Sequence, residues 1–254
     1  MTAIADSLRI FRYSVLGSTN DQTRNLISAG KVPHNFIVVA SKQTSGRGRA
    51  GKAWQSMPGN LFCSFALAPS VPAIRLSEIS LVIAVALQAA IASVLPFSSE
   101  PKIKWPNDIL IDGSKISGIL LEVVNTPGQE CSTVITGVGV NIVSCPRSLD
   151  RPSTCLLDFG YGGDAQSFLE ILTGQFLSCM AGWEKNGFNS VRQAWLDHAV
   201  GLGEEIAIRC GNIQQEGLFE TLDGTGALVL RLPGGSLRTI TAGDVFLGFS
   251  SFYN

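Results

Sequence analysis

Apolar and polar residues along the chain predict short strands separated by helices. Residues 10–15 predict a short strand, and residues 36–41 (FIVVAS) are a continuous apolar run of strand length, which predicts a buried strand. Between them, residues 18–31 (STNDQTRNLISAGK) have the pattern of a helix, with Thr19 as its expected N-cap and Gly30 at its expected C-terminal end.

A second strand-and-helix pair follows. Residues 60–67 (NLFCSFAL) predict a strand, and residues 76–95 predict a long helix that ends before Pro96. Residues 79–99 contain no charged side chain and have the length of a membrane span. This segment is rich in alanine and is interrupted by serine, glutamine and proline. We therefore interpret it as a helix of the protein core that is buried on nearly all of its sides.

The middle of the chain predicts a hairpin and then two helices. Asp112-Gly113 lies between two apolar runs, which is typical of a tight β-turn. Residues 132–143 predict a further strand, in which Gly137 and Gly139 allow another segment to approach closely. Helices are expected over 164–185 and 188–200. With strands pairing locally and helices packing on one side, the expected fold class is α+β with a mixed sheet.

The pattern changes near residue 201. From there, short β-rich runs alternate with turns such as Asp223-Gly224 and Gly234-Gly235. We therefore predict two domains, a larger one over residues 1–200 and a small SH3-like β-barrel over residues 201–254.

Composition limits the partners of the chain. Of 254 residues, 45% are hydrophobic and 15% are charged, with a net charge of −1, so the chain lacks the basic balance of a nucleic-acid-binding protein. The N-terminal residues contain no secretory apolar core, and six scattered cysteines without a C-x-x-C pair suggest a reducing cytoplasm rather than a zinc site. We therefore expect a cytoplasmic protein without DNA or membrane as a partner.

Residues 45–54 (SGRGRAGKAW), called the glycine loop below, match two phosphate-binding patterns at once, G-x-G-x-x-G and G-x-x-x-x-G-K. Both patterns need a helix that begins within the loop. The sequence after Lys52 contains Pro58-Gly59 and then a strand, and Ala53 stands where the second pattern needs Ser or Thr. The glycine loop is therefore expected to form neither of these two kinds of phosphate-binding loop.

Four cations lie on or next to the glycine loop, and no acidic residue occurs between Asp21 and Glu78 to neutralise them locally. They are Lys42, Arg47, Arg49 and Lys52. Glycines allow close backbone approach, and arginine forks suit phosphate and carboxylate oxygens, so the loop is interpreted as an anion site. A solvated basic loop and a non-enzymatic anion- or RNA-binding module are the alternatives.

Taken together, the motifs resemble those of the biotin–protein ligase family over most of the chain. The matching segments, in order, are STN (18–20), QTSGRGRAGKAWQS (43–56), NLFCSFAL (60–67), KWPNDILI (104–111), KISGILLE (115–122), GVGVN (137–141) and AGDV (242–245). Their order and spacing carry the resemblance, rather than any one motif.

The resemblance implies the fold of a class II aminoacyl-tRNA-synthetase-like catalytic domain and a two-step reaction. Biotin and MgATP would give biotinyl-5′-adenylate and pyrophosphate, and the acyl group would then pass to one lysine of a biotin carboxyl carrier domain of a biotin-dependent carboxylase. Implied catalytic residues are Arg47, Arg49 and Lys104. Implied biotin-binding residues are Ser18, Thr19, Asn20, Gln43, Arg47, Gly48, Arg49, Lys104 and Gly118.

The nucleotide site is less sharply implied. Its candidates are Arg49, Trp54, Asn107, Lys115 and Asn141. Trp54 either covers the adenine or only fixes the loop, and Asn107 and Asp108 either orient nucleotide and metal or only shape a turn. Asp108 is the single candidate metal ligand, and no other protein ligand for magnesium is assigned. Structural support is an equal alternative for Glu122 and Asn141, and Cys63 is expected to be core packing.

The sequence also departs from the family pattern. Position 50 is alanine, and position 52 is lysine where many members carry arginine, so bidentate contact at position 52 is in doubt. Only about nine residues precede the first predicted strand, so we expect no N-terminal DNA-binding domain and no repressor activity. A lipoate-type ligase, which shares the fold and the adenylation chemistry, is the closest rival; the GRGRxGxxW and KWPND motifs favour biotin.

Overall fold

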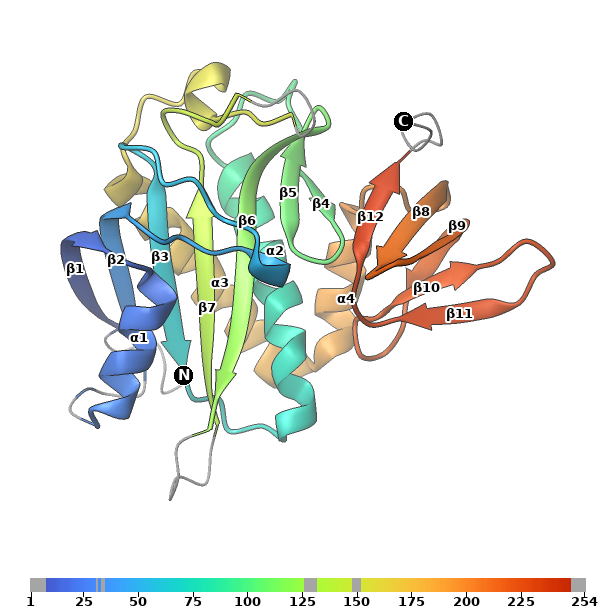
Figure 1. The fold of residues 1–254 in the computed structure, drawn as a ribbon, viewed down its shortest axis with the longest axis horizontal. Helices are drawn as coiled ribbons and strands as arrows, with labels where there is room; N and C mark the ends of the chain where they lie inside the picture. The colour runs from blue at the N-terminus through green and yellow to red at the C-terminus, as the bar shows by residue number, and fades with distance from the viewer. Residues whose placement is uncertain (1–7, 31, 33–34, 126–131, 148–151, 248–254) are drawn as a thin grey trace.

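The structure, a computed structural model, describes residues 8–30, 32, 35–125, 132–147 and 152–247. Within these residues the chain forms a seven-stranded sheet with helices packed on it and a separate five-stranded sheet (Figure 1). The first part contains β1 (Arg9–Leu16), α1 (Thr19–Ser28), β2 (Phe36–Gln43), β3 (Leu61–Leu67), α2 (Ile79–Ala92), β4 (Lys102–Lys104), β5 (Asp108–Ile111), β6 (Ser114–Val124), β7 (Thr133–Val140), α3 (Ala165–Asn186) and α4 (Phe188–Asp197).

The larger sheet has the strand order β1-β2-β3-β7-β6-β5-β4. Strands β1 and β2 are parallel and are joined across α1, whereas every later pair in the sheet is antiparallel. The mixed sheet and the predicted α+β class are confirmed. The elements expected over 10–15, 36–41, 60–67 and 132–143 are all strands, with bounds within two residues of those expected, except that β7 ends three residues early, at Val140.

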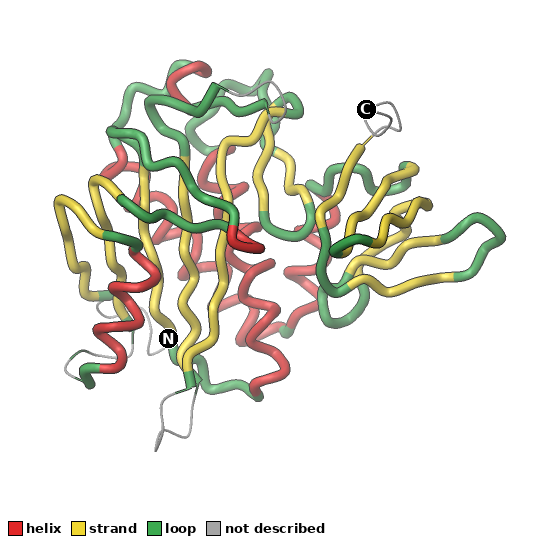
Figure 2. The backbone as a smooth tube through the Cα atoms, in the orientation of Figure 1, coloured by secondary structure: helices red, strands yellow, loops and turns green. Residues whose placement is uncertain are grey.

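The helices cover both faces of the sheet, so the expectation that they pack on one side is wrong. Ile27 of α1 packs with Phe36 and Val38 on one face. Ile37 and Phe65 point to the other face, in the core that α2, α3 and α4 share. Figures 1 and 2 show α1 in front of the sheet and the other three helices behind it. The parallel β1–α1–β2 crossover is the cause, because it places its helix on one face while the antiparallel strands leave the other face to the later helices.

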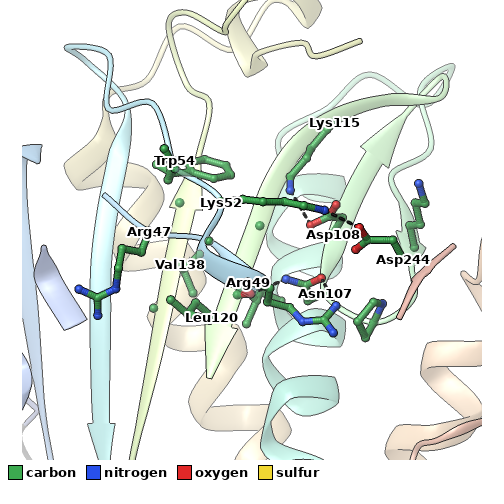
Figure 3. Close-up of a pocket in the computed structure, with 18 of the residues that line it drawn as sticks. Arg47, Arg49, Lys52, Trp54, Asn107, Asp108, Lys115, Leu120, Val138 and Asp244 are labelled. Carbon is green, nitrogen blue, oxygen red and sulfur yellow. Dashed lines mark hydrogen bonds and ion pairs between the residues drawn. The ribbon is translucent and has the colours of Figure 1, made fainter. Parts of the chain in front are cut away.

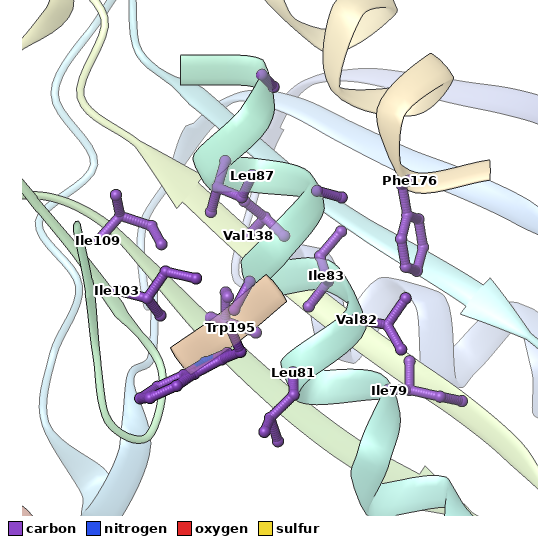
Figure 4. Close-up of a cluster of buried hydrophobic side chains, with 14 of the residues drawn as sticks. Ile79, Leu81, Val82, Ile83, Leu87, Ile103, Ile109, Val138, Phe176 and Trp195 are labelled. Atoms are coloured by element: carbon purple, nitrogen blue, oxygen red, sulfur yellow. The ribbon is translucent and has the colours of Figure 1, made fainter. Parts of the chain in front are cut away.

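Helix α2 lies in the middle of the protein. Ten of its residues are buried, and its side chains contact the sheet, α3 and α4 (Figure 4). The helical segment 73–92 is apolar and long enough to cross a membrane, but 67% of its most apolar window is buried inside the protein. Its interpretation as a core helix is confirmed, with a 3₁₀ turn over Ala73–Glu78 in place of its expected first turn.

The β5–β6 hairpin forms as predicted. Asp112 and Gly113 both have positive φ, 49° and 76°, as a two-residue hairpin turn of this kind requires. The hairpin brings Asp108 opposite Gly118 in register, which positions polar residues of β5 beside the glycine-bearing strand β6.

The C-terminal strands form the smaller sheet. They are β8 (Glu205–Cys210), β9 (Ile213–Leu222), β10 (Leu228–Arg231), β11 (Leu237–Ile240) and β12 (Asp244–Leu247), in the order β11-β10-β9-β8-β12. No ladder among the described residues joins β11 to β12, so closure into an SH3-like barrel stays a prediction. The first predicted domain begins at residue 1 and the second ends at residue 254, and both of these positions lie outside the described residues.

Several hydrogen bonds attach this sheet to the larger part of the molecule, among them those of Trp105 and Arg192. Trp105 donates its indole N–H to the Gly226 carbonyl at 3.2 Å. Arg192 of α4 donates from Nε to the Leu222 carbonyl at 2.6 Å. These contacts hold the smaller sheet so that β12 faces the turn between β4 and β5.

Candidate functional site

A cavity of about 330 Å³ lies between the N-terminus of α1, the glycine loop, strands β6 and β7, the β4–β5 turn and β12 (Figure 3). All but one of the predicted site residues line it. They are Ser18, Thr19, Asn20, Gln43, Arg47, Gly48, Arg49, Trp54, Lys104, Asn107, Asp108, Lys115 and Gly118. Segments up to 100 positions apart therefore meet at one place, as the sequence predicts.

The glycine loop folds back on itself without starting an α-helix. Gly48 donates its backbone N–H to the Lys52 carbonyl at 2.7 Å, and Trp54 donates to the Gly46 carbonyl at 2.9 Å. A single 3₁₀ turn over Arg49–Gly51 forms the tip. The next regular element is β3, so no helix N-terminus is offered to a phosphate. The expectation that the loop is neither phosphate-binding pattern is confirmed.

At two positions of the loop the backbone requires glycine, for a different structural reason at each. Gly51 has φ 72°, in the left-handed region that favours glycine. A Cβ on Gly46 would lie 2.7 Å from the Trp54 carbonyl oxygen, so the two arms of the loop meet too closely for a side chain. Ala50 also has a positive φ of 52°, which is uncommon for a residue with a side chain.

Both ends of the glycine loop are ion-paired. Arg47 pairs with Asp21 of α1, and its other nitrogen lies 3.6 Å from Glu122 of β6. The hydrogen bond that Arg47 donates to the Asp21 carboxylate raises the pKa of the Arg47 guanidinium, against the smaller opposing effect of burial. At the other end, Lys52 pairs with Asp244 of β12. Figure 3 shows Arg47 pointing away from Lys52, so the two pairs lie at opposite ends of the loop.

The α1 N-terminus carries a buried polar network. Thr19 donates its backbone N–H to Gln43 Oε1 at 2.8 Å, and its hydroxyl lies 3.2 Å from the same oxygen. The expected N-cap is wrong by one residue: Ser18 occupies that position, and its side chain makes no capping hydrogen bond. Gln43, at the end of β2, instead accepts the N–H of Thr19, the first residue of the helix, which has no partner within the helix.

Asn20 is held on all sides within this network. Its Nδ2 donates to Glu122 Oε2 at 2.8 Å, and its Oδ1 lies 2.6 Å from the Ser64 hydroxyl. A Cβ on Gly137 would lie 2.3 Å from Asn20 Oδ1, so the glycine makes room for this amide. The prediction that Gly137 permits close approach is confirmed, and the group that approaches is a side chain.

Lys104 lies at the end of β4, beside the C-terminal sheet. Its Nζ is 5.9 Å from the centre of the Phe246 ring, a cation–π contact. Next to it, Asn107 donates from Nδ2 to the Ile119 carbonyl at 2.6 Å and accepts from Arg49 at 3.3 Å. Asn107 therefore shapes the turn and also touches a loop arginine, so both of its expected roles are compatible with its position.

A comparison with known proteins identifies the family. The sequence profile described as the Biotin/lipoate A/B protein ligase family matches residues 13–141, just over half of the chain. The chain belongs to this family. The profile of the Biotin protein ligase C terminal domain matches residues 201–248.

Relatives within the ligase family cover most of the chain. It is 36% identical to a biotin--[acetyl-CoA-carboxylase] ligase of Paracoccus denitrificans over 83% of this chain and 90% of that protein. It is 30% identical to the bifunctional ligase/repressor BirA of Bacillus subtilis over 93% of this chain and 73% of that protein. The biotin protein ligase of Aquifex aeolicus in complex with biotin and ATP has the same fold, with a TM-score of 0.79 over 94% of this chain and 97% of that chain at 23% identity.

In this member of the ligase family, Trp54 lies flat on the glycine positions of the sheet. Its ring fills the space above Gly139 and Gly118, where a Cβ would lie 2.5 Å and 3.0 Å from ring atoms. Lys115 Nζ lies 5.4 Å from the ring centre and 2.6 Å from Asp108 Oδ1. The indole N–H of Trp54 is buried without a hydrogen-bond partner. An aromatic face, a lysine and a carboxylate are thus grouped at this end of the cavity.

One predicted site residue of this ligase lies elsewhere. Asn141 is buried and donates from Nδ2 to the Thr154 carbonyl at 3.0 Å, and it is not among the residues that line the cavity. Of the two roles expected for Asn141, support of the fold and contact with the nucleotide, the geometry supports the first. Cys63, expected in the core, is fully buried, and burial raises the pKa of its thiol. Cys131 lies outside the described residues.

Four residues of the ligase site are not found by sequence reasoning. Asp21 and Asp244 hold the glycine loop, Ser64 supports the polar network, and Phe246 contacts Lys104. Ser64 had a visible signal, since it is a lone hydroxyl in the apolar run 60–67. The ion pairs had none: Asp244 belongs to the AGDV motif, but it lies 192 positions from Lys52 and nothing in the sequence indicates that the two pair.

Proposed function

We propose that the chain is a biotin–protein ligase that activates biotin with ATP and transfers it to a lysine of a biotin carboxyl carrier domain. One observation carries the proposal beyond family membership. Three cations from two separate segments, Arg47 and Arg49 of the glycine loop and Lys104 of β4, line the same cavity as the polar N-terminus of α1. This arrangement suits a ligand with a neutral polar ring at one end and a carboxylate at the other.

The biotin ring would lie at the α1 end. The ureido group donates and accepts hydrogen bonds, which suits the hydroxyls and amides of Ser18, Thr19 and Gln43. Leu120 and Val138 line the cavity nearby and offer apolar surface for the sulfur ring and the pentanoate chain. The amide of Asn20 is already bonded to Ser64 and Glu122, so its role would be to fix this end of the pocket.

In the first step a carboxylate oxygen of biotin attacks the α-phosphorus of ATP. A P–O bond forms, the bond to the β-phosphate bridge breaks, and pyrophosphate leaves. Because both reactants are anions, cations must bring them together and stabilise the charge that develops. In this proposal Arg47, Arg49 and Lys104, which line the cavity, would do so.

The nucleotide would lie toward Trp54 and Lys115. Stacking on the indole face and a fixed lysine suit an adenine ring and its attached groups. Trp54 is also packed tightly on Gly139, so anchoring of the loop and contact with adenine are compatible roles for the same ring.

Magnesium fits this end of the cavity as an ion carried by ATP. Two carboxylates, Asp108 and Asp244, line the cavity, and each is paired with a lysine. No group of three or more His, Cys, Asp or Glu side chains that could hold a metal occurs in the described part of the chain. Mg²⁺ is usually held by one or two carboxylates together with substrate phosphates, so Asp108 would be its protein ligand and the ion would neutralise phosphate charge.

In the second step the ε-amine of the carrier lysine attacks the acyl carbon of biotinyl-adenylate. An amide bond forms, AMP leaves, and the amine loses a proton. Water would attack the same mixed anhydride, so the intermediate must be covered until the carrier arrives. The glycine loop crosses the cavity and would provide that cover.

ATP–pyrophosphate exchange tests the proposal. The purified chain would be assayed with biotin, with lipoate and with neither; exchange that depends on biotin is expected. Lipoate-dependent exchange would instead assign the other activity of the family, and no exchange with either acid would reject the proposal. Transfer would be measured with a purified carrier domain. Absence of repressor activity and a cytoplasmic location also stay predictions, the first checked by a gel shift with biotin-operon DNA.

A further inference from the structure

We infer that three carboxylates, Asp21, Glu122 and Asp244, are positioning residues that clamp the glycine loop across the cavity. The loop itself has four nearby cations and no carboxylate of its own. Arg47 and Lys52 form ion pairs with Asp21, Glu122 and Asp244, each of which lies on a different element from the loop. The inference rests on the proposed function for its purpose, which is retention of the adenylate.

The two ends of the clamp use different parts of the fold. Asp21 lies on the first turn of α1 and Glu122 lies on β6, at the end of the cavity where the biotin ring is placed. Asp244 lies on β12 of the C-terminal sheet, at the nucleotide end. The loop is thus bound to α1 and β6 at one end and to the C-terminal sheet at the other, where Figure 3 shows the pair of Lys52 with Asp244. This gives the C-terminal sheet a role in the reaction, as a fixed point for the lid.

Glu122 connects the clamp to the biotin end. It accepts from Asn20 at 2.8 Å and lies 3.2 Å from Arg24 and 3.6 Å from Arg47. One carboxylate therefore contacts both the helix that forms the ring pocket and the loop that covers it. Movement of the Asn20 amide would be transmitted to Arg47 through this single group.

The solvent exposure of the Arg47–Asp21 and Lys52–Asp244 ion pairs determines how strongly each one holds the loop. Side-chain exposures are 37% and 46% for Arg47 and Asp21, and 40% and 47% for Lys52 and Asp244. Ion pairs this open to water are weak and are screened by salt, so each shifts loop opening by up to about fivefold. Weak clamps suit a lid that must open to admit both substrates and then the carrier lysine.

Limited proteolysis of the ligand-free protein tests the clamp without using biotin. Trypsin can cut the loop after Arg47, Arg49 and Lys52. Asp21→Asn and Asp244→Asn leave that sequence intact, and each should speed loop cleavage by about two- to fivefold, with a roughly 4- to 25-fold effect in the double variant. Asp21→Glu should restore the wild-type rate, because it keeps the charge. Added salt should speed cleavage of the wild type more than that of the double variant.

The matched control is Glu220→Gln. Glu220 pairs with Arg231 at 2.6 Å in the C-terminal sheet, with similar exposure, and it does not line the cavity. It should leave loop cleavage unchanged. Equal cleavage of the double variant and the wild type, or an equal increase in the control, would overturn the clamp.

Release of the intermediate gives the functional readout. With preformed biotinyl-adenylate, the double variant should release it faster than the wild type and should label bystander proteins more. If the wild type makes no adenylate, the proposed function fails. The trypsin cleavage rates would still show whether the three carboxylates hold the loop. If the wild type makes it and the double variant releases it at the same rate, the clamp alone fails.

Discussion

The indole of Trp54 occupies the space that a side chain at Gly139 would need. A Cβ at position 139 would lie 2.5 Å from Trp54 Cε2, well inside any normal contact distance. Trp54, the last residue of the glycine loop, therefore packs directly on Gly139 of β7. This one strand position controls where the loop ends.

Gly139→Ala should therefore displace the Trp54 ring and weaken ATP binding. Overpacking of this kind costs about 1–3 kcal/mol, which corresponds to a rise of roughly 5- to 150-fold in KM for ATP if the ring moves. Steady-state exchange kinetics at varied ATP would measure it. Gly162→Ala is the control, since nothing lies within 4 Å of a Cβ there. An unchanged KM for ATP in Gly139→Ala would separate the ring from the nucleotide site.

Local chemistry explains why much of the fold can be predicted from the sequence. Asp112-Gly113 determines its turn by backbone preference alone, and the apolar run 36–41 is long enough to define a buried strand. The site residues could be grouped because family motifs occur in a fixed order. Asn141 shows the limit of that reasoning: a motif position can support the fold from behind the cavity.

The errors have a common physical cause, which is pairing between distant segments. Thr19 is the first residue of α1 rather than its N-cap, and its N–H bonds to Gln43, 24 positions later. α1 lies on its own face because β1 and β2 are parallel neighbours, which the apolar pattern of each strand does not reveal. The partners of Arg47 and Lys52 likewise come from other elements, and charge pattern alone cannot choose among distant carboxylates.

Ser64→Ala should weaken biotin binding through the α1 network. The Ser64 hydroxyl is fully buried and lies 2.8 Å from Thr19 Oγ1 and 2.6 Å from Asn20 Oδ1. Its removal leaves a buried acceptor unpaired, which costs about 1–3 kcal/mol. We expect a lower free energy of unfolding by that amount and a higher KM for biotin with little change in kcat. Ser41→Ala, at an exposed position of β2, should change neither quantity. A normal KM for biotin in Ser64→Ala would remove the network from the biotin site.

Cys63 should stay unreactive in the folded protein across the alkaline range. Burial disfavours its thiolate and raises its pKa, so raising the pH from 7 to 9 should form almost no thiolate at this position. Cys145 and Cys210 are only partly buried and should be alkylated by iodoacetamide faster than Cys63. Peptide mass spectrometry after timed labelling would measure each cysteine. Labelling of Cys63 in native protein as fast as in denaturant would contradict its placement in the core.

Lys104→Ala should abolish adenylate formation and leave the fold intact. Lys104 lies on the cavity wall next to Phe246, and loss of a cation that stabilises the reacting phosphate costs on the order of 100-fold or more in rate. Biotin-dependent exchange should fall by at least that factor, while the melting temperature should stay within a few degrees. Lys102→Ala is the matched control, because Lys102 lies on the same strand, pairs with Glu100 and does not line the cavity. Near-normal exchange in Lys104→Ala would remove this lysine from the chemistry, whereas equal losses in both variants would point to a damaged strand.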